Sequence, residues 1–311
     1  MARLEAQSKL LYYPTPNHVV DLLGTWFKTI CPARLADPCC GTGEALQRFA
    51  NGLGMQHTIE TWGVELSYSR AQEAAKTLDR VLPASFYSLT ASRWSPASVG
   101  LVFNNCPYDW SEIYERDPKG QLHRTRHELL FVDAATRKLV PGGHQAIIIP
   151  RGILGDPMLV GAHGRERFAR MVLGWYEQVL IYRFPDGEYE RFKQVVVLGI
   201  NKRAQYTPAS KEAIEAICRL ADAENEIPVL PVGKAEFSIP ASPDKVRFTY
   251  TPVEPAQLTQ AANQCTPVGS DEYGRATYVR PLGAPFAPAM PLSVGHVTMC
   301  ATRSRLNNCL A

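Results

Sequence analysis

Short apolar runs alternate with amphipathic segments over the first two thirds of the chain, and the two patterns predict different elements. Runs rich in β-branched residues predict strands, and segments with apolar residues three or four apart predict helices. The predicted strands are Arg34–Asp37, Thr58–Glu65, Ser85–Leu89, Val99–Asn104, Gln145–Pro150, Gln178–Phe184 and Gln194–Ile200. The predicted helices between them are Pro16–Thr29, Glu44–Leu53, Ser67–Leu82, Glu128–Leu139 and Arg165–Trp175. Strands separated by helices indicate an α/β fold, with helices on both faces of a parallel sheet.

The last two predicted strands are close together in the sequence, and residues 185–187 between them read Pro-Asp-Gly. These residue types favour a turn. The two strands are therefore predicted to form a hairpin, so that one strand runs antiparallel to the others at the end of the sheet, as open α/β sheets allow.

The pattern changes in the last third of the chain. One more helix is predicted over Pro208–Leu220, and eleven of the 24 prolines follow it. Because proline has no N–H to donate to a neighbouring strand, little regular structure is expected there beyond short strands at Val246–Thr251 and Ala276–Arg280. The chain is therefore predicted to have a first domain over residues 1–205 and a small, Pro-rich, loop-rich C-terminal module over residues 206–311, a candidate for substrate recognition.

Composition and charge exclude several classes of protein. The 311 residues are 45% apolar, which is enough for a large core, and the net charge of +3 is too small to indicate a nucleic-acid partner by itself. The eight cysteines form no C-x-x-C pair and show no metal-ligand spacing, so we expect reduced thiols in a cytoplasmic protein and no metal site. The polar start, Met1–Lys9, and the lack of a long apolar stretch predict neither a signal peptide nor a membrane span.

The first motif, residues 37–44, reads Asp-Pro-Cys-Cys-Gly-Thr-Gly-Glu and joins a predicted strand to a predicted helix. Gly41 and Gly43 allow the backbone to approach a flat ligand. A nicotinamide-binding turn would need a third glycine at the position of Leu46. A cofactor with a charged amino-acid tail and no pyrophosphate suits the motif better, with Asp37 beside its ammonium group. The alternative is an ordinary tight loop.

The second motif is Gly63-Val64-Glu65, at the end of a predicted strand and 24 residues after Gly41. An acid about 20 residues beyond a glycine-rich turn can accept hydrogen bonds from ribose hydroxyls. Glu65 is therefore a candidate ribose ligand. The alternative is a solvated residue at a strand end.

The third motif, residues 104–110, reads Asn-Asn-Cys-Pro-Tyr-Asp-Trp and follows another predicted strand. An aromatic amino nitrogen is a poor nucleophile because its lone pair is delocalised into the ring. Two acceptors directed at its hydrogens, the Asn105 side-chain oxygen and the Cys106 backbone carbonyl, would draw the nitrogen towards a tetrahedral geometry. Pro107 would stiffen the turn, and Tyr108 would offer a stacking face. The alternative is a polar turn with a packed tyrosine.

Together these motifs resemble the signature of amino-group methyltransferases, especially N6-adenine enzymes, whose catalytic motif is Asn-Pro-Pro-Tyr or Asp-Pro-Pro-Tyr. Residues 12–16, Tyr-Tyr-Pro-Thr-Pro, resemble their N-terminal cofactor-binding segment, and residues 139–143 resemble another turn of class I methyltransferases. The order of the segments is that of the group with a C-terminal target-recognition region. The resemblance implies a Rossmann-like, seven-stranded methyltransferase sheet and S-adenosylmethionine as cofactor.

The resemblance also assigns roles to residues. The cofactor-binding residues it implies are Tyr13, Thr15, Pro16, Asp37, Cys39, Gly41, Gly43, Glu65 and Asn105, with the first three beside the methionine moiety. The catalytic residues it implies are Asn105, Cys106, Pro107 and Tyr108. Tyr108 and Phe192 would stack on the two faces of a target base, which must leave a duplex to be reached. The alternative for Phe192 is packing on the sheet edge.

Most of the chain also resembles a protein family that is found in bacteria and mobile elements. This family is known only as a methyltransferase domain of unknown function. The residues that carry this resemblance are Asp37–Leu46, Asn105–Trp110, Arg183–Asp186, Phe192, Gln194, Pro291, Leu292, Gly295 and His296. This family implies a methyltransferase but no particular substrate.

Two departures from the N6-adenine pattern affect the expectations. Cys106 replaces the first proline of the catalytic motif, which keeps the backbone carbonyl but lowers rigidity, so the rate is affected more than the type of reaction. No clear acid follows the third predicted strand, where many relatives contact the adenine of the cofactor. Ser88, Leu89 and Thr90 occupy that region.

Two groups of basic residues are candidates for phosphate contact. The first comprises Arg116, Lys119, His123, Arg124, Arg126 and His127, and the second comprises Arg165, Arg167 and Arg170. A solvated helical face is an equal alternative for both groups.

The sequence therefore predicts an enzyme, an S-adenosylmethionine-dependent methyltransferase that acts on adenine N6 in DNA. Nucleic acid is the expected partner, with DNA ahead of RNA, and no membrane is expected. Three alternatives remain: an adenine in RNA, a glutamine side chain of a protein, or a non-catalytic nucleic-acid-binding module that kept the fold, which Cys106 would suit. The sequence carries no signal for the oligomeric state.

Overall fold

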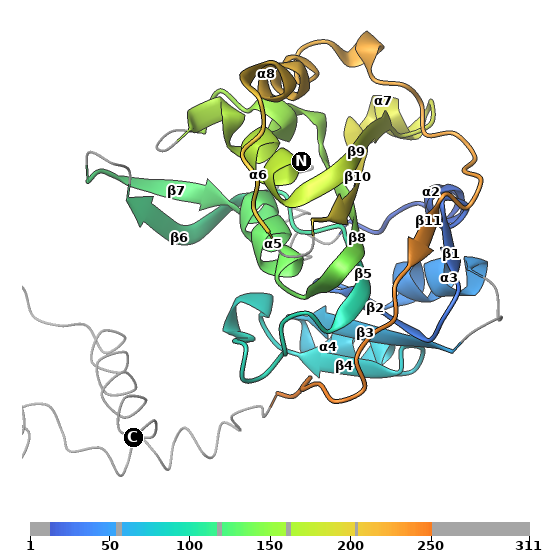
Figure 1. Cartoon of the computed structure of the whole chain (residues 1–311). Helices are drawn as coiled ribbons and strands as arrows, with labels where there is room; N and C mark the ends of the chain where they lie inside the picture. Colours follow the sequence, from blue (N-terminus) through green and yellow to red (C-terminus); the bar gives the residue numbers. More distant parts are fainter. Residues whose placement is uncertain (1–12, 54–57, 117–119, 160–162, 203–204, 251–311) are drawn as a thin grey trace, which may run out of the picture. The chain divides into compact units, whose positions relative to one another are not determined.

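A seven-stranded sheet forms the centre of the structure (Figure 1). The computed structural model describes residues 13–250 apart from residues 54–57, 117–119, 160–162 and 203–204. In spatial order the strands are β4 (Arg80–Pro83), β3 (Ile59–Glu65), β2 (Ala33–Asp37), β5 (Val99–Asn104), β8 (Leu139–Pro150), β10 (Gln194–Asn201) and β9 (Tyr176–Arg183). β10 runs antiparallel to β8 and β9, and the other neighbouring strands are parallel. The predicted Rossmann-like α/β sheet is confirmed.

Helices cover both faces of this sheet. They are α2 (Asn17–Gly24), α3 (Glu44–Gly52), α4 (Tyr68–Ala74), α5 (His127–Thr136), α6 (Arg167–Trp175), α7 (Glu188–Phe192) and α8 (Lys211–Arg219). α2 and α3 pack together on one side of the sheet, and α5 and α6 lie on the other side (Figure 1). β2 and β5 are consequently buried along their whole length. Within the part of the chain that the structure describes, no helix has the length and apolar character needed to cross a membrane.

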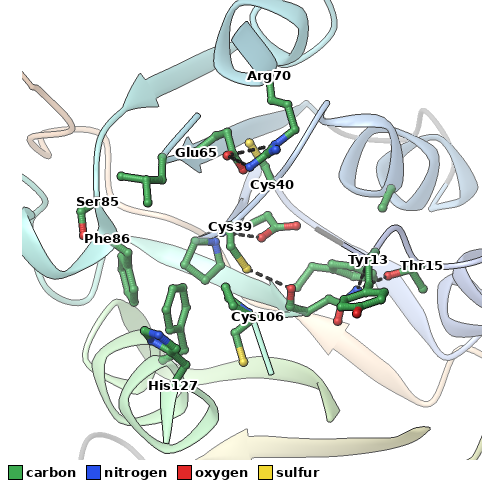
Figure 2. Close-up of a pocket in the computed structure, with 18 of the residues that line it drawn as sticks. Tyr13, Thr15, Cys39, Cys40, Glu65, Arg70, Ser85, Phe86, Cys106 and His127 are labelled. Atoms are coloured by element: carbon green, nitrogen blue, oxygen red, sulfur yellow. Dashed lines mark hydrogen bonds and ion pairs between the residues drawn. The ribbon is translucent and has the colours of Figure 1, made fainter. Parts of the chain in front are cut away.

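The carboxyl ends of β2, β3, β4 and β5 meet at one edge of the sheet. Residues at these strand ends and in the segments that follow them line a cavity, together with residues of α5 (Figure 2). In parallel α/β sheets this edge is where ligands bind. The strand order therefore brings the three predicted motifs to one place.

The third strand predicted along the sequence, Ser85–Leu89, is not where the structure has a strand. The helix predicted over Ser67–Leu82 ends at Ala74, and the strand predicted over Ser85–Leu89 lies earlier, at β4. β4 pairs with β3, and just before it the Asp79 carboxylate accepts hydrogen bonds from the N–H and hydroxyl of Thr61 at 2.7 and 2.8 Å. This tie holds the chain against β3, so residues 80–83 extend along that strand. Phe86–Ser88 form a 3-10 helix instead of a strand.

Other differences arise where strands pair outside the main sheet. The helix predicted over Pro16–Thr29 ends at Gly24, and β1 (Phe27–Thr29) then pairs in parallel with β11 (Phe237–Ile239). The hairpin of β6 (Trp110–Arg116) and β7 (Leu122–Arg126) projects from the body directly after the third motif (Figure 1). Its sequence is mostly polar, so no apolar alternation predicts it. The predicted β9–β10 hairpin is confirmed, with α7 in its connection.

Residues 205–250 pack against the earlier part of the chain. α8 contacts α6, and β11 pairs with β1. Of the predicted strand Val246–Thr251, only a bridge between Phe248 and Trp94 is present in the described residues. The predicted strand Ala276–Arg280 lies outside the described residues. The boundary predicted at residue 205 stays a prediction.

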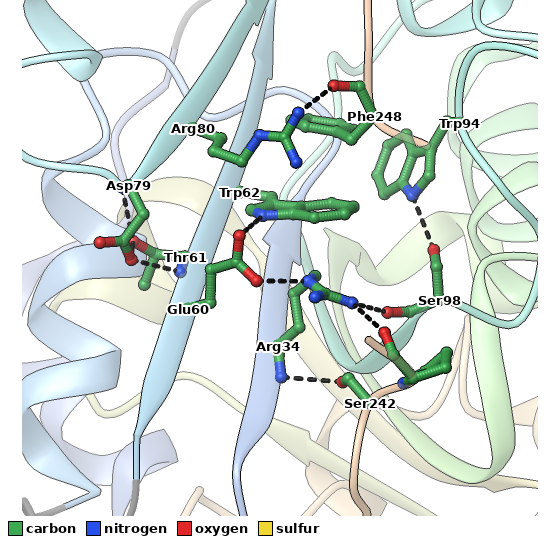
Figure 3. Close-up of polar contacts among 11 residues, drawn as sticks. Arg34, Glu60, Thr61, Trp62, Asp79, Arg80, Trp94, Ser98, Ser242 and Phe248 are labelled. Carbon is green, nitrogen blue, oxygen red and sulfur yellow. Dashed lines mark hydrogen bonds and ion pairs between the residues drawn. The ribbon is translucent and has the colours of Figure 1, made fainter. Parts of the chain in front are cut away.

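A cluster of aromatic rings and arginines fixes the segment that ends at Tyr250 (Figure 3). The Phe248 ring stacks on Trp62 with centroids 4.2 Å apart, and the Arg34 guanidinium lies 4.2 Å from the same indole on its other side. Arg80 Nη2 donates to the Phe248 carbonyl at 2.6 Å. Stacking and cation–π contacts of buried rings stabilise the packing of the Phe248 segment against the sheet. The hydrophobic core therefore extends from the sheet into this segment.

Candidate functional site

A cavity of about 340 Å³ contains most of the predicted site residues (Figure 2). The predicted residues that line it are Tyr13, Thr15, Asp37, Cys39, Glu65, Asn105, Cys106 and Pro107. The predicted residues that are not part of its described lining are Pro16, Gly41, Gly43, Tyr108 and Phe192. The volume is in the range of small-molecule sites. The three motifs and the N-terminal segment therefore form one site.

The turn after β2 has the backbone conformation that its glycines predict. Gly41 and Gly43 have φ angles of 57° and 82°, in the left-handed region that favours glycine. The Cys39 N–H donates to Asp37 Oδ1 at 2.8 Å, and the Gly41 N–H donates to Glu65 Oε2 at 3.0 Å. The glycines therefore shape the turn and Gly41 holds Glu65, while Asp37 and Cys39 line the cavity.

Gly43→Ala is expected to lower the free energy of unfolding by about 1–3 kcal/mol. An alanine there must adopt the left-handed backbone angle, and its Cβ would lie 2.9 Å from Leu78 Cγ. Gly52→Ala is the matched control, because among the described residues outside its own helix and chain neighbours no atom lies within 4 Å of its Cβ position. We expect the control to be neutral or more stable by about 0.4–1 kcal/mol. Urea denaturation measures both, and equal stability of the two variants would contradict this account of the turn.

Asp37 is one of two buried acids in the described lining of the cavity. It is 3% exposed, and burial raises its pKa to about 7, against the opposing effect of the hydrogen bond from the Cys39 N–H. The nearby charge of Glu65 also raises this pKa. A cationic ligand group would stabilise the ionised form of Asp37, so this position favours a ligand with a positive charge.

Glu65 is fixed by donors on both of its oxygens. Oε1 accepts from the Ser67 N–H at 2.8 Å and from Arg70 Nη2 at 2.6 Å, and Oε2 accepts from the Gly41 N–H. Glu65 is 5% exposed and lies in the cavity wall at the end of β3. A hydroxyl group of a ligand would therefore meet an acceptor whose position is already set.

Asn105 links the separate segments of the site. Its Nδ2 donates to the Tyr13 carbonyl at 3.0 Å and to Thr15 Oγ1 at 2.9 Å. Its Oδ1 accepts from the Tyr108 hydroxyl. Its backbone carbonyl accepts a hydrogen bond from the Cys39 thiol, with Sγ at 3.0 Å. The N-terminal segment, the glycine turn and the third motif are thus joined at one residue.

Cys106 fills the position of the missing proline with a neutral side chain. It is 3% exposed and packs in the hydrophobic core, and burial raises the pKa of its thiol well above the usual value. The thiol is therefore protonated and unreactive at neutral pH. The substitution adds no charge to the site.

The two predicted stacking residues lie outside the cavity. The Tyr108 ring is nearly parallel to the Tyr13 ring, at 10°, with centroids 6.2 Å apart. Phe192 is 36% exposed and ends α7, two residues before Gln194. Gln194 Nε2 donates to the Tyr108 hydroxyl at 2.7 Å. Tyr13 therefore covers part of the Tyr108 ring. The hydrogen bond from Gln194 ties the Tyr108 hydroxyl to the start of β10.

One end of the cavity was not predicted. This end is lined by Ser85, Phe86, Tyr87, His127 and Phe131, and sequence reasoning names only His127 among them, as a candidate for phosphate contact. It also misses Arg70, which lines the cavity beside Glu65. Because β4 ends at Pro83, the segment after this strand begins at Ala84, and the region named from the sequence, Ser88–Thr90, does not line the cavity. The apolar pair Val81-Leu82 is a local signal for this strand, but it is too short to select it over Ser85–Leu89.

This unpredicted end is aromatic and uncharged. The rings of Phe86 and Phe131 have centroids 5.2 Å apart, and the Tyr87 hydroxyl is 2.6 Å from His127 Nδ1. Burial lowers the pKa of His127, which favours its neutral form. Figure 2 shows Phe86 and His127 on the side of Cys39 away from the N-terminal segment. A flat apolar ring fits here, and a charged group fits at Asp37.

The described arginine side chains of the two predicted basic groups are all paired with acids. The pairs are Arg124–Glu112 at 2.8 Å, Arg126–Glu128 at 2.7 Å, Arg165–Asp222 at 3.6 Å, Arg167–Glu115 at 2.5 Å and Arg170–Glu166 at 2.6 Å. Lys119 lies outside the described residues. Phosphate contact by these groups stays one of two interpretations. In the described part of the chain, no three His, Cys, Asp or Glu side chains come together as a metal site.

Solved structures that match this chain include bacterial methyltransferases. A Listeria monocytogenes protein assigned to the class I S-adenosylmethionine-dependent methyltransferases is 13% identical, with a TM-score of 0.47 over 71% of this chain and 76% of that one. A type I restriction-modification methyltransferase subunit from Streptococcus thermophilus is 17% identical, with a TM-score of 0.45 over 69% of this chain and 54% of that one. An S-adenosylmethionine-dependent O-methyltransferase from Thermotoga maritima is 12% identical, with a TM-score of 0.36 over 64% and 68%. These low values assign no substrate to this chain.

Sequence comparison places the chain in a family. None of the curated protein sequences matches it. The model of the uncharacterised methyltransferase family (DUF6094) matches residues 1–242, which include every described residue that lines the cavity. The chain therefore belongs to this uncharacterised methyltransferase family.

Proposed function

We propose that this chain binds S-adenosylmethionine and transfers its methyl group to an amino nitrogen, the N6 atom of adenine in DNA. One observation carries the proposal: Asp37, Glu65 and the amide of Asn105 line the same cavity. Acids that suit a cationic nucleoside and an amide that suits an amino group thus belong to one site.

The chemistry of the cavity fits this cofactor along its length. Asp37 offers a carboxylate to the ammonium group, and Glu65 offers a fixed acceptor to the ribose hydroxyls. Phe86 and Phe131 offer aromatic surface to the adenine ring. When bound, the cofactor supplies an electrophilic methyl group on a sulfonium. The residues around it need only to bind, orient and exclude water.

Asn105 Oδ1 and the Cys106 carbonyl oxygen are the proposed acceptors for the two hydrogens of the amino group. Two such hydrogen bonds would hold the nitrogen with its lone pair directed at the methyl group. The N–C bond forms as the S–C bond breaks, and the nitrogen then releases one proton to solvent. Because Cys106 contributes its backbone carbonyl, the loss of proline at this position leaves the acceptor in place.

The target base is proposed to stack on the part of Tyr108 that Tyr13 leaves uncovered, with Phe192 as the second stacking residue. The partial exposure of Phe192 and the contact of nearby Gln194 with Tyr108 support this. A base in a duplex would have to leave the stack to reach this place. DNA is proposed as the polymer because the order of the segments resembles that of adenine enzymes with a C-terminal target-recognition region.

Purified protein incubated with S-adenosylmethionine carrying a tritiated methyl group is expected to label DNA. The test compares DNA, RNA and cell extract as acceptors, and the label should be released by DNase and recovered as N6-methyladenine. The Asn105→Ala protein is the control that distinguishes transfer from a contaminating activity. Label that only RNase or only protease removes would contradict DNA as the acceptor. Cofactor binding with no label in any acceptor would favour a non-catalytic module.

A further inference from the structure

Gln194 contacts the site from β10, far from the three motifs in the sequence. It is 6% exposed, and its Nε2 donates to the Tyr108 hydroxyl at 2.7 Å. That hydroxyl donates to Asn105 Oδ1. Asn105 Nδ2 in turn donates to the Tyr13 carbonyl and to Thr15 Oγ1. The four side chains and the Tyr13 carbonyl form one continuous chain of hydrogen bonds.

The Tyr13 carbonyl fixes the polarity of this chain at one end, and the contact from Gln194 agrees with it at the other. A backbone carbonyl can only accept, so the Tyr13 oxygen requires the nitrogen of the Asn105 amide to face it. An amide nitrogen can only donate, so Gln194 Nε2 makes the Tyr108 oxygen an acceptor and leaves its single hydrogen for Asn105 Oδ1. The Ile148 carbonyl, 3.4 Å from the Tyr108 hydroxyl, is a weaker competitor for that hydrogen. Both ends therefore favour the same orientation of the Asn105 amide.

This orientation matters because the two ends of an asparagine amide have nearly the same shape. If the amide turned by half a rotation, Nδ2 would present hydrogens to the hydrogens of an acceptor amino group. Such an Asn105 would repel the group that it is proposed to bind. The amide must therefore be held with its oxygen on one side before an acceptor enters the cavity.

We propose that Gln194 is a positioning residue that acts through the Tyr108 hydroxyl to hold the Asn105 amide in its acceptor orientation. The inference rests on the proposed function, in which Asn105 Oδ1 accepts a hydrogen bond from the acceptor amino group. It gives the Tyr108 hydroxyl a role separate from the stacking of its ring. It also assigns a role to Gln194, which the sequence singled out only by resemblance.

The test measures the Asn105 amide directly by NMR of 15N-labelled protein. The two side-chain N–H signals of Asn105 are assigned as the pair that disappears in Asn105→Asp. In Gln194→Leu and in Tyr108→Phe, we expect these signals to shift and their hydrogen exchange to accelerate by about tenfold, as for the loss of one hydrogen bond. Gln145→Leu is the matched control, because Gln145 is buried in β8 and accepts from the Tyr176 hydroxyl away from the site.

Unchanged Asn105 signals in both folded variants would overturn the proposal. Equal changes in Gln145→Leu would also overturn it, because they would reflect a general loosening of the sheet. In the methyl-transfer assay, kcat of Gln194→Leu should fall by about tenfold, while KM for the acceptor and the calorimetric affinity for S-adenosylmethionine stay within about twofold. The NMR result requires no acceptor. If the wild-type protein transfers no methyl group, the proposed function fails while the orientation of Asn105 is still decided.

Discussion

An Asn105→Ala protein is expected to lose at least about a hundredfold of its methyl-transfer rate, the size of effect that follows loss of one preorganised hydrogen bond at a reacting group. The Asn105 amide oxygen is the only side-chain acceptor proposed for the amino group, and alanine cannot replace it. The cofactor residues Asp37 and Glu65 are held by other contacts, so binding of S-adenosylmethionine should stay close to that of the wild type. Tritium transfer measures the rate, and calorimetry with the demethylated cofactor measures the affinity.

Asn51→Ala provides the matched control for this experiment. Asn51 lies on α3, where its Oδ1 accepts from Gln47 Nε2 at 3.0 Å on the surface, and its loss should change neither quantity. Transfer at the wild-type rate by Asn105→Ala would remove Asn105 from the catalytic site. A parallel loss of rate and affinity would instead make Asn105 a cofactor ligand that acts through Tyr13 and Thr15.

The local parts of the site could be predicted from the sequence because each follows from a few adjacent residues. Gly41 and Gly43 require left-handed backbone angles, and they are found in that conformation between a strand and a helix. The end of β5 coincides with the predicted strand, so Asn105 is found at its carboxyl end as expected. Apolar runs and turn residues carry this information without reference to distant parts of the chain.

The aromatic end of the cavity could not be predicted, because it depends on where β4 pairs. The choice between Arg80–Pro83 and Ser85–Leu89 is settled by pairing with β3, which no local pattern describes. The sequence pattern therefore predicts Phe86 and Tyr87 within a strand, whereas they follow the carboxyl end of β4. His127 lies 40 residues from Tyr87 and meets it only in the folded chain.

The contact between Gln194 and Tyr108 is a functional contact that the sequence could not predict either. The two residues are 86 positions apart, and they meet because the antiparallel β10 pairs with β8 near Ile148 and Pro150. Resemblance marked both residues, and chemistry suggested a stacking role for Tyr108 alone. The hydrogen bond between them follows from the order of strands in the sheet. Contacts of this kind require the tertiary structure.

Asp37→Asn is expected to weaken binding of S-adenosylmethionine by about 2–5 kcal/mol, which is about 30-fold or more, because it removes the buried charge that faces the ammonium group. Calorimetry at pH 8 measures the loss. Asp133→Asn, which removes a charge paired with Arg137 on the surface of α5, is the matched control and should bind normally. Normal binding by Asp37→Asn would contradict the proposed orientation of the cofactor.

The affinity for S-adenosylmethionine should depend on pH in a direction that simple loss of structure would not produce. The pKa of Asp37 in the free protein is about 7, above its ordinary value of 3.8, because burial favours the neutral form. An ammonium group pairs with the ionised form, so binding lowers this pKa and releases a proton below pH 7. Between about pH 5.5 and 7, where an α-amino group with a pKa near 8 stays charged, the affinity of the wild type should rise with pH.

The same raised pKa predicts how stability changes without the cofactor. The folded protein binds the Asp37 proton more tightly than the unfolded chain, so the stability contributed by this group is present below about pH 4 and is lost as the pH rises to about 7. Asp37→Asn cannot ionise, so it should be at least as stable as the wild type at pH 8, and its affinity should not vary between pH 5.5 and 7 through this group. An Asp37→Asn protein that binds weakly and also melts earlier at pH 8 would show that the aspartate supports the fold rather than the cofactor.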